Sequence, residues 1–565
     1  MKGSSSSAVV GGAGLVALLA ILLPVNATAR WLATAPGPSP VDLVLGVWLM
    51  KGALLATAVA LAVVHWAGRA ARVSQPYVPA RPMRIAEARS TTVLLGLLLL
   101  LATAARVKAL DTELWLDETD TLVRYATMQM RQLVSTYDSQ NQHPLYVLLA
   151  KLSYLIFSGA EWSIRVPAVV FGVASLWTTY AFARRVTSRA EALLAVFILA
   201  LSYHHVWFSQ NARGYTALLF FTPIATWLFL RLGATENPVP GRVVWGYATV
   251  IALASYTHLT AVFIAVGHAL AVTVAATWRA RPEGRNALGR TGAALALSAL
   301  LTTSVYALVL PQVLGEVLRP TLDGAAVEWT SPWWLVTETL RVLSSGVPGG
   351  LLTSGIAALV LIVGVASYWR QSRLLVLSMF VPVVVTAAAV IAMNHNLWPR
   401  FFFFAASFFV LAALRGGFVI ARAVFGTQGE RVAVVGAAAL ASLSAVMLPR
   451  AWQPKQQYMA AARFVQDERA AGDSVAAFGV AAGVYEARGV PGDWHLAPSL
   501  DELTAMERSS RRLWVIYTFP VHLRAMHPEL ARHVATPPYR EVRAFSATVG
   551  GGEVRILLHE VRPTP

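Results

Sequence analysis

The chain of 565 residues contains no cysteine. Disulfides, thiolate metal sites and cysteine nucleophiles are therefore excluded, although the redox compartment stays open. Charged residues are also scarce, at 13% of the chain, whereas 56% of the residues are apolar. Apolar stretches of about 20 residues recur along the chain, and this composition is typical of a polytopic α-helical membrane protein.

Acidic residues are in the minority, with 29 Asp and Glu against 46 Lys and Arg and a formal net charge of +17. Such a charge in a soluble protein would suggest a nucleic-acid partner. Most arginines here form short clusters between apolar runs, where they act as topology signals. We therefore expect the lipid bilayer, and no nucleic acid, as the partner of these residues.

The apolar runs predict about thirteen membrane spans. They lie near residues 8–29, 43–66, 91–110, 165–183, 190–208, 212–231, 243–257, 259–278, 291–310, 350–368, 374–393, 400–421 and 432–449. With the N-terminus inside, every strong basic cluster falls in a cytoplasmic loop. The boundary between 243–257 and 259–278 is weak, so a single broken helix is the alternative there, and it would reverse the orientation of all later spans.

Residues 143–159 form an apolar segment that is short for a span and carries Lys151 near its middle. A span at this point would place every later basic cluster outside the cell. We therefore expect a juxtamembrane helix in the outer leaflet, within one long external loop of residues 111–162. The other external segments large enough for function are residues 311–349 and the polar tail.

Hydropathy divides the chain into three parts. Residues 1–90 form a two-helix membrane extension with a basic cytoplasmic loop, residues 91–449 form the main transmembrane module, and residues 450–565 form an extracytoplasmic tail. The tail combines a helical stretch with strand-like runs, which predicts a small α/β domain of about 115 residues. These elements lie at residues 458–469, 474–478, 513–517 and 553–558.

The sequence LWLDETD, from Leu114 to Asp120, follows the third apolar run. Carboxylates that emerge where a chain leaves the bilayer can meet both water and a lipid-borne substrate. The alternative is a hydrated helix N-terminus, where acids interact favourably with the dipole, and we favour it for Asp111 and Glu113, as well as for Asp120. For Asp117 we favour catalysis.

Six segments together resemble bacterial glycosyltransferase family 39, which is related to protein O-mannosyltransferases and lipid A aminoarabinose transferases. They are WLDE, QHPLYVLLAKL, EWSIRVPAVVFG, FSQNARGYTALLF, SYTHLTAVF and NLWPRFFFFAASFFVLAAL, in this order. The resemblance covers roughly Thr91 to Val446. It implies a GT-C membrane fold with residues 91–449 as the catalytic module. It also implies an inverting transferase that takes a sugar from a polyprenyl-phosphate donor at the extracytoplasmic face of the bacterial cytoplasmic membrane.

The resemblance also implies roles for residues that match the family motifs. Asp117 falls on the catalytic acid position, with Glu118 beside it. The residues implied in donor phosphate binding are Arg213, Arg400 and Lys151. Those implied in substrate binding are His143, Asn211, His258 and Tyr215. Many relatives carry Glu or Asp in place of Asn211, so no cofactor is certain here and a divalent metal stays open.

The chemistry asks for the same residue types independently of the family. Arginine has a permanent charge and forked donors that suit the developing charge on a leaving phosphate. A carboxylate within hydrogen-bond reach is the simplest base for the attacking group of an acceptor, which could be a glycan, a lipid or a protein.

Each assignment has a structural alternative. Arg213 and Arg400 could equally be interfacial anchors, and Lys151 could contact lipid headgroups. His143 and His258 are more typical of satisfied structural residues. The tryptophans of residues 329–334 suit an interfacial belt, with sugar stacking as the second interpretation.

Two other functional classes share this topology. A secondary transporter needs charged or broken helices near the bilayer midplane, and often an internal repeat. A noncatalytic assembly protein of cell-envelope glycan export has no need of WLDE with arginines on the same side. The sequence therefore favours the enzyme.

Overall fold

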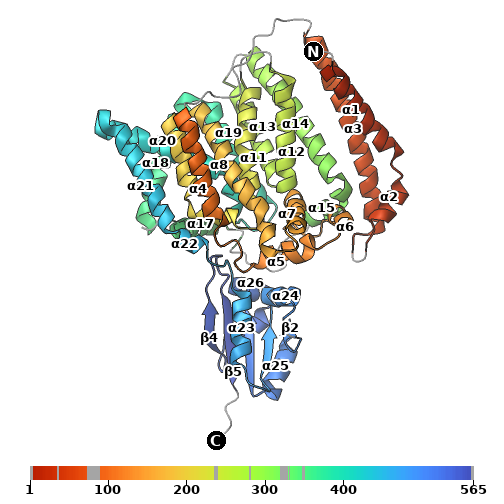
Figure 1. Ribbon diagram of the computed structural model, residues 1–565, viewed down its shortest axis with the longest axis vertical. Helices are drawn as coiled ribbons and strands as arrows, with labels where there is room; N and C mark the ends of the chain where they lie inside the picture. The colour runs from red at the N-terminus through yellow and green to blue at the C-terminus, as the bar shows by residue number, and fades with distance from the viewer. Residues whose placement is uncertain are drawn as a thin grey trace.

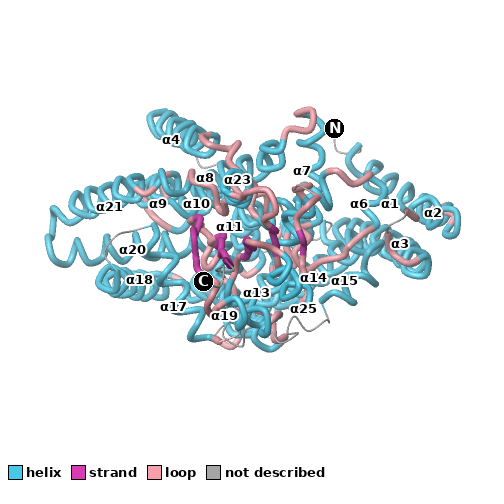
Figure 2. Tube along the Cα trace, turned by 90° about the horizontal axis from the view of Figure 1, so that it is seen from below, coloured by secondary structure: helices cyan, strands magenta, loops and turns pink. Residues whose placement is uncertain are grey.

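The computed structural model describes residues 4–34, 37–72, 89–234, 239–278, 281–317, 329, 331–346, 350–490 and 492–560. The membrane module is a set of long helices, and the C-terminal domain projects from one end of it (Figure 1). Seen from that end, the strands lie in front of the middle of a broad array of helices (Figure 2).

The N-terminal extension is a helical hairpin of α1 (Ser4–Leu22), α2 (Val25–Leu32) and α3 (Pro40–Arg72). The chain bends by 82° between α1 and α2. Pro24 stands at this bend and causes it, because its ring and missing N–H prevent the helix from continuing. Lys51 Nζ donates to the carbonyl of Ile21 at 3.2 Å and to that of Leu23 at 2.6 Å, so α3 caps the end of α1.

A helix occupies each of the predicted spans in the main module. These helices are α4 (Arg89–Val107), α8 (Val166–Val186), α9 (Arg189–Ala200), α10 (Tyr203–Ser209), α11 (Tyr215–Leu232), α12 (Gly241–Thr257), α13 (Ala261–Ala276), α14 (Arg281–Tyr306), α18 (Gly350–Gln371), α19 (Arg373–Ala392), α20 (Ala406–Phe425) and α21 (Gly429–Val446). Among the described residues, seven helices are long and apolar enough to cross a membrane, or up to nine if each bent pair is one span. The number thirteen therefore stays a prediction.

The structure can be compared with the predicted spans at two places, the boundary between 243–257 and 259–278 and the span 190–208. Helices α12 and α13 stand side by side as separate helices (Figure 1). Neither is among the helices long and apolar enough to cross a membrane by themselves, so two spans at this point stay a prediction. The predicted span 190–208 is instead a pair, α9 and α10, bent by 61°. Arg106 of α4 explains this break, because its guanidinium donates to the carbonyls of Leu199 and Ala200 at the end of α9, at 3.2 and 3.1 Å.

Short elements fill the loops at the end that carries the C-terminal domain. In the first loop they are α5 (Leu116–Asp120), the π-helical turn η1 (Thr121–Ala126), α6 (Met130–Ser135), α7 (Pro144–Ile156) and η2 (Glu161–Arg165). Elsewhere they are η3 (Ala307–Val309), α15 (Leu310–Val317), α17 (Pro332–Gly346), η4 (Pro399–Ala405) and α22 (Leu448–Ala451). At the opposite end, η5 (Gly426–Gln428) joins α20 and α21. Helix α7 has 13 residues, which is about 20 Å, too short for a hydrocarbon core of about 30 Å. This length agrees with the expected juxtamembrane helix.

The basic loops gather at the other end of the module. Arg189 donates to Thr91 Oγ1 at 3.4 Å, Gln371 to the Val186 carbonyl at 3.1 Å, and Arg290 to the Ala234 carbonyl at 2.6 Å. These bonds tie together loops that the positive-inside rule assigns to the cytoplasm. The loop of residues 111–162 and the C-terminal domain lie together at the end away from them (Figure 1).

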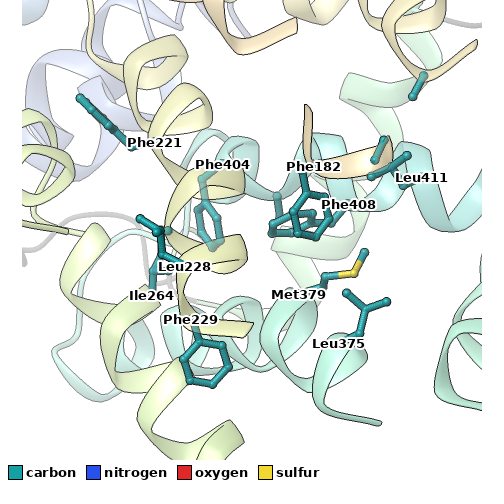
Figure 3. Packing of buried hydrophobic residues seen from close by; sticks show 14 of the residues in the cluster. Phe182, Phe221, Leu228, Phe229, Ile264, Leu375, Met379, Phe404, Phe408 and Leu411 are labelled. Carbon is teal, nitrogen blue, oxygen red and sulfur yellow. The ribbon is translucent and has the colours of Figure 1, made fainter. Parts of the chain in front are cut away.

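The core of the module is a large cluster of buried apolar side chains from α8, α9, α11, α13, α19 and α20. Figure 3 shows Phe182 and Phe408 close together, and their ring centroids are 5.3 Å apart. Phe404, from η4, is also buried in this cluster. The core therefore fixes the start of α20, and with it the adjoining segment that carries Arg400.

The C-terminal domain has α23 (Tyr458–Glu468), β1 (Ser474–Ala477), α24 (Val480–Ala487), β2 (His495–Leu496), α25 (Leu500–Ser509), β3 (Arg512–Tyr517), α26 (Pro520–Met526), α27 (Pro528–Val534), β4 (Arg540–Phe545) and β5 (Val554–Glu560). Its sheet has the order β2-β1-β3-β5-β4. Strand β1 is parallel to β2 and β3, whereas β5 is antiparallel to β3 and β4. Apolar residues cover both faces of the sheet, so the predicted α/β fold of the tail is observed.

Helices α18 and α20 cross at two glycines with almost no space between their backbones. A Cβ at Gly416 would lie 1.8 Å from the carbonyl oxygen of Val360, and a Cβ at Gly364 would lie 1.7 Å from that of Ala412. Both obstacles are backbone atoms, so an added methyl group would force the helices apart. Small residues at such crossings allow close helix packing in membranes.

We expect Gly416→Ala to destabilise the protein by about 1–3 kcal/mol, because overpacking forces backbone shifts. The adjacent Gly417 has open space around its Cβ position, so Gly417→Ala is a matched control that keeps or slightly raises stability. Thermal unfolding of the purified protein in detergent measures both. Equal unfolding midpoints for the two variants would contradict the close crossing.

Candidate active site

Helix α5 places two neighbouring acids in different surroundings. Thr121 Oγ1 donates to the Asp117 carbonyl at 2.9 Å and to the Ala212 carbonyl at 3.3 Å. These bonds join α5 to the turn of residues 210–214 between α10 and α11. Both Asp117 and Glu118 are buried, with 5% and 0% of their surfaces exposed. Because buried carboxylates need partners, the contacts of each acid indicate what it does.

Glu118 is fully partnered. Arg165 donates to its two carboxylate oxygens at 2.8 and 2.5 Å, and the Ala212 N–H donates at 2.9 Å. Burial by itself would raise the pKa of Glu118, but Arg165 and Lys455 outweigh it and hold the pKa below its usual range. Glu118 is thus a charged, buried cross-link between α5, η2 and the turn of residues 210–214.

Asp117 is only partly partnered. Its Oδ2 lies 3.8 Å from Arg213 Nε and 3.5 Å from Arg400 Nη1. Asp117 Oδ2, Arg213 Nε and Arg400 Nε are buried atoms without a hydrogen-bond partner. The three side chains therefore face one another with unused hydrogen-bonding capacity, which is the arrangement expected where a polar substrate completes a site.

The turn of residues 210–214, which carries Arg213, is held by other parts of the chain. The Arg213 guanidinium donates to Asn141 Oδ1 at 3.3 Å. The Gly214 N–H donates to His143 Nδ1 at 2.9 Å, and Lys455 Nζ donates to the Gln210 carbonyl at 2.6 Å. Arg213 and its turn are therefore fixed in position by two separate parts of the chain, the loop that carries Asn141 and His143 and the start of the C-terminal domain at Lys455.

Arg400 comes from the start of η4. Its guanidinium lies 4.9 Å from the ring centre of Trp398, a cation–π contact. Its side chain is 23% exposed, against 2% for Arg213. Arg400 is therefore the more accessible of the two cations that face Asp117.

Three predicted substrate-binding residues form one aromatic group behind Arg213. The His143 ring lies 5.4 Å from Tyr215 and 4.5 Å from His258, and Tyr215 lies 5.5 Å from His258. Burial, followed by Arg213, His258 and Arg400, lowers the pKa of His143 well below its usual value. His143 is therefore neutral near pH 7, and its Nδ1 can accept the Gly214 N–H.

The last two predicted residues differ in their relation to the site. Trp115 Nε1 donates to Asn211 Oδ1 at 3.2 Å, which leaves the buried Asn211 Nδ2 as a donor without a partner. Lys151 instead donates to the Ala126 carbonyl at 3.1 Å, on the face of α7 that packs against η1. The contacts thus connect Asn211 to the turn that carries Arg213, whereas Lys151 is bonded to η1.

The donor set around Asp117 does not suit a divalent cation. Two guanidiniums face this carboxylate, and Asn211 Oδ1 is already bound to an indole N–H. Within the described ranges there is also no group of three or more His, Asp or Glu side chains placed to hold a metal. The charged groups available for chemistry at Asp117 are therefore the protein's own side chains.

Three important residues were not selected from the sequence. Arg165 lies in the motif EWSIRVPAVVFG, and an arginine at the start of an apolar span was a usable signal. Lys455 and Gln456 lie in the tail, where nothing in the pattern marks them. Gln456 Oε1 accepts the Leu116 N–H at 3.2 Å, at the start of α5. Burial lowers the pKa of Lys455 to about 7, despite the opposing effect of Glu118.

Fold and site together define a polytopic helical membrane protein with a buried acid–arginine site beside a small C-terminal α/β domain. Residues 141–312 match the family model described as dolichyl-phosphate-mannose-protein mannosyltransferase. The matched segment includes His143, Arg213 and His258. This match confirms the resemblance to membrane glycosyltransferases of the protein mannosyltransferase type. No curated protein matches the chain significantly.

Several solved structures are similar to part of the chain. The archaeal oligosaccharyltransferase AglB from Archaeoglobus fulgidus, in complex with an inhibitory peptide and a dolichol-phosphate, is 12% identical over 83% of this chain and 74% of that one, with a TM-score of 0.46. ArnT from Cupriavidus metallidurans bound to undecaprenyl phosphate is 12% identical over 84% and 98%, with a TM-score of 0.46. The arabinosyltransferase EmbB from Mycobacterium smegmatis is 13% identical over 71% and 43%, with a TM-score of 0.39.

We expect Glu118→Gln to destabilise the protein by about 3–5 kcal/mol, because it leaves the Arg165 charge buried without a counter-charge. Glu430→Gln is the control, since Glu430 is 57% exposed and pairs with Arg422 at 3.2 Å. Surface pairs of this kind contribute about 0–1 kcal/mol. Thermal unfolding in detergent compares the two, and equal losses would show that the Glu118–Arg165 pair is not structural.

Proposed function

We propose that the protein is an inverting glycosyltransferase that moves a sugar from a polyprenyl-phosphate donor to an acceptor. The observation that carries this proposal is Asp117 facing Arg213 and Arg400, with unpartnered polar atoms on all three side chains. The description of the matched family names dolichyl-phosphate-mannose, and this supports a polyprenyl phosphate as the carrier of the sugar.

The two arginines bind the donor phosphate in this proposal. When the bond between the sugar C1 and the phosphate oxygen breaks, the leaving polyprenyl phosphate gains negative charge. Fixed guanidiniums stabilise that charge without reorganisation, and burial strengthens the interaction. Arg213 is fixed by the turn of residues 210–214, whereas the more exposed Arg400 meets the phosphate as it arrives. Lys151 is buried and donates to the Ala126 carbonyl, so in this proposal it supports the loop beside the site and does not bind the donor.

Asp117 acts as the base. The acceptor oxygen or nitrogen attacks the sugar C1 from the face opposite the phosphate, and its proton passes to the Asp117 carboxylate. The distances of 3.5 and 3.8 Å to the arginines leave Oδ2 free to accept this proton or to orient the acceptor. Glu118, which is saturated by Arg165, supports Asp117 through α5 and does not touch the reacting atoms.

The remaining residues bind substrate around this centre. The free Asn211 Nδ2 donates to a sugar hydroxyl or a phosphate oxygen, and Trp115 fixes the orientation of the amide. His143, Tyr215 and His258 present an uncharged aromatic wall beside the arginines. A neutral wall next to two cations directs the negative charge of the donor toward the arginines.

The site faces the extracytoplasmic side of the bacterial cytoplasmic membrane in this proposal. The basic loops, which bonds from Arg189, Arg290 and Gln371 join, lie away from the end that carries Asp117 and the C-terminal domain, and this separation supports the orientation. Under the positive-inside rule the basic end is cytoplasmic, so the site meets donors that have been moved to the outer leaflet.

We expect Asp117→Asn to lower turnover about 100- to 10,000-fold, because it removes the base and keeps the size of the side chain. Stability and donor binding stay near normal. Asp120→Asn is the matched control on the same helix and retains most of the activity. The measurement is release of undecaprenyl phosphate from undecaprenyl-phosphate-linked sugars in the presence of acceptor. Full turnover in Asp117→Asn would contradict the proposal, and an inactive Glu118→Gln that remains folded would transfer the role of base to Glu118.

A further inference from the structure

A cavity of about 280 Å³ lies in the C-terminal domain, at the carboxyl ends of its parallel strands. Phe478 and Gly479 follow β1, Ala497 and Pro498 follow β2, and His522 comes from α26 after β3. In sheets of this kind, ligands bind outside the carboxyl ends of the parallel strands. The cavity is close to the lower end of the range of about 300–1,000 Å³ that small-molecule sites occupy, so its size suits a single ring.

The backbone around this cavity is unusual. Ala497, which lines it, has φ of 53°, and Phe519, which immediately precedes α26, has φ of 48°. Such conformations are costly for residues other than glycine and tend to persist at ligand sites, where the surrounding structure holds them. The two strained positions point to a site that is built rather than a packing defect.

An aromatic row leads from the cavity to the active site. The His522 ring stacks on Trp329 at 6.4 Å, with 23° between the planes. Trp329 lies 5.1 Å from Trp398, and Trp398 carries Arg400 at 4.9 Å from its ring centre. Arg400 then reaches Asp117 at 3.5 Å. The row is held in place by a bond from the Leu397 N–H to the Trp329 carbonyl, at 2.9 Å.

This placement separates the row from an ordinary membrane belt. A belt tryptophan presents its ring to lipid at the interface. Trp333, on α17, fits that description because it is 72% exposed. Trp329 instead contacts a histidine of the C-terminal domain, and Trp334 packs on Trp398 at 5.3 Å. Trp329, Trp334 and Trp398 therefore join two parts of the chain beside the acid–arginine site.

We infer that the cavity and the aromatic row bind the acceptor, and that the acceptor is a saccharide. The inference rests on the proposed transferase function and names its substrate class. The cavity lining has no carboxylate, lysine or arginine, so it suits an uncharged ligand. Indole and imidazole rings offer flat apolar faces for the C–H faces of sugar rings, together with N–H groups for hydroxyls. His522 Nδ1 is a buried atom without a partner, and it supplies such a contact.

The aromatic row sets the orientation of the acceptor, because it runs from the cavity to the acid–arginine site. One sugar ring occupies the cavity, and the chain continues over Trp329 and Trp398 so that its end reaches Asp117. Donor and acceptor then approach Asp117 from different sides, with the phosphate on Arg213 and Arg400 and the saccharide along the tryptophans.

The test uses the full-length protein in detergent and short oligosaccharides of mannose, arabinose, galactose and rhamnose as probes, with binding measured by saturation-transfer NMR. We expect at least one probe to bind, and Trp329→Ala and His522→Ala to weaken its binding about three- to tenfold. Trp333→Ala is the matched control and leaves binding unchanged. Trp329→Phe keeps an aromatic face and recovers most of the binding, which excludes misfolding as the cause.

Three outcomes overturn the inference. They are binding of no saccharide, saccharide binding that is insensitive to both Trp329→Ala and His522→Ala, and capture of acceptor peptides that depends on these two residues. Two further measurements separate this inference from the proposed function. Undecaprenyl phosphate binding stays unchanged in Trp329→Ala, whereas Asp117→Asn keeps saccharide binding and loses transfer. Saccharide binding without any transfer in the wild type would overturn the transferase and leave a saccharide-binding site.

Discussion

The buried ion pair between Glu118 and Arg165 is the constraint on which the site depends. Arg165 also donates to the carbonyls of Leu110, Thr112 and Glu113, at 2.7, 2.8 and 3.1 Å, so one guanidinium fixes the path of the chain as it leaves α4. Because Glu118 is held in this way, the adjacent Asp117 has its backbone fixed while its carboxylate stays free. Two neighbouring acids thus differ in role through their surroundings, one neutralised inside the structure and one facing two cations without satisfying them.

The C-terminal domain completes this arrangement from the other side. Gln456 accepts the Leu116 N–H at the start of α5, and Lys455 donates to the turn that carries Arg213. Arg488 pairs with Glu161 at 2.7 Å, and Trp207 Nε1 donates to Thr548 at 2.8 Å. The domain therefore supports the acid–arginine site directly, so its removal should disturb Asp117 and Arg213 as well as the acceptor surface.

Much of this could be predicted from the sequence, for identifiable reasons. Apolar runs predicted a helix at every span because burial in lipid requires local hydrogen bonding. The ordered motifs selected Asp117, Arg213 and Arg400, which the fold brings together. Lys455 and Gln456 were missed because their contacts cross 245 and 340 residues, a separation that no local pattern reports. Strands β2 and β4 were missed because β2 has two residues and β4 is mostly exposed, so neither shows a clear alternation.

The central claim is that Arg213 and Arg400 hold a lipid phosphate beside Asp117. The most direct test is a binding titration of undecaprenyl phosphate by native mass spectrometry. Arg400→Lys keeps the charge but loses the forked donors, and we expect about tenfold weaker binding, with Arg213→Ala at least as weak. Arg422→Ala is the control, because Arg422 is exposed and pairs with Glu430. Equal affinities in all four proteins, the wild type included, would contradict the account and make both arginines structural anchors.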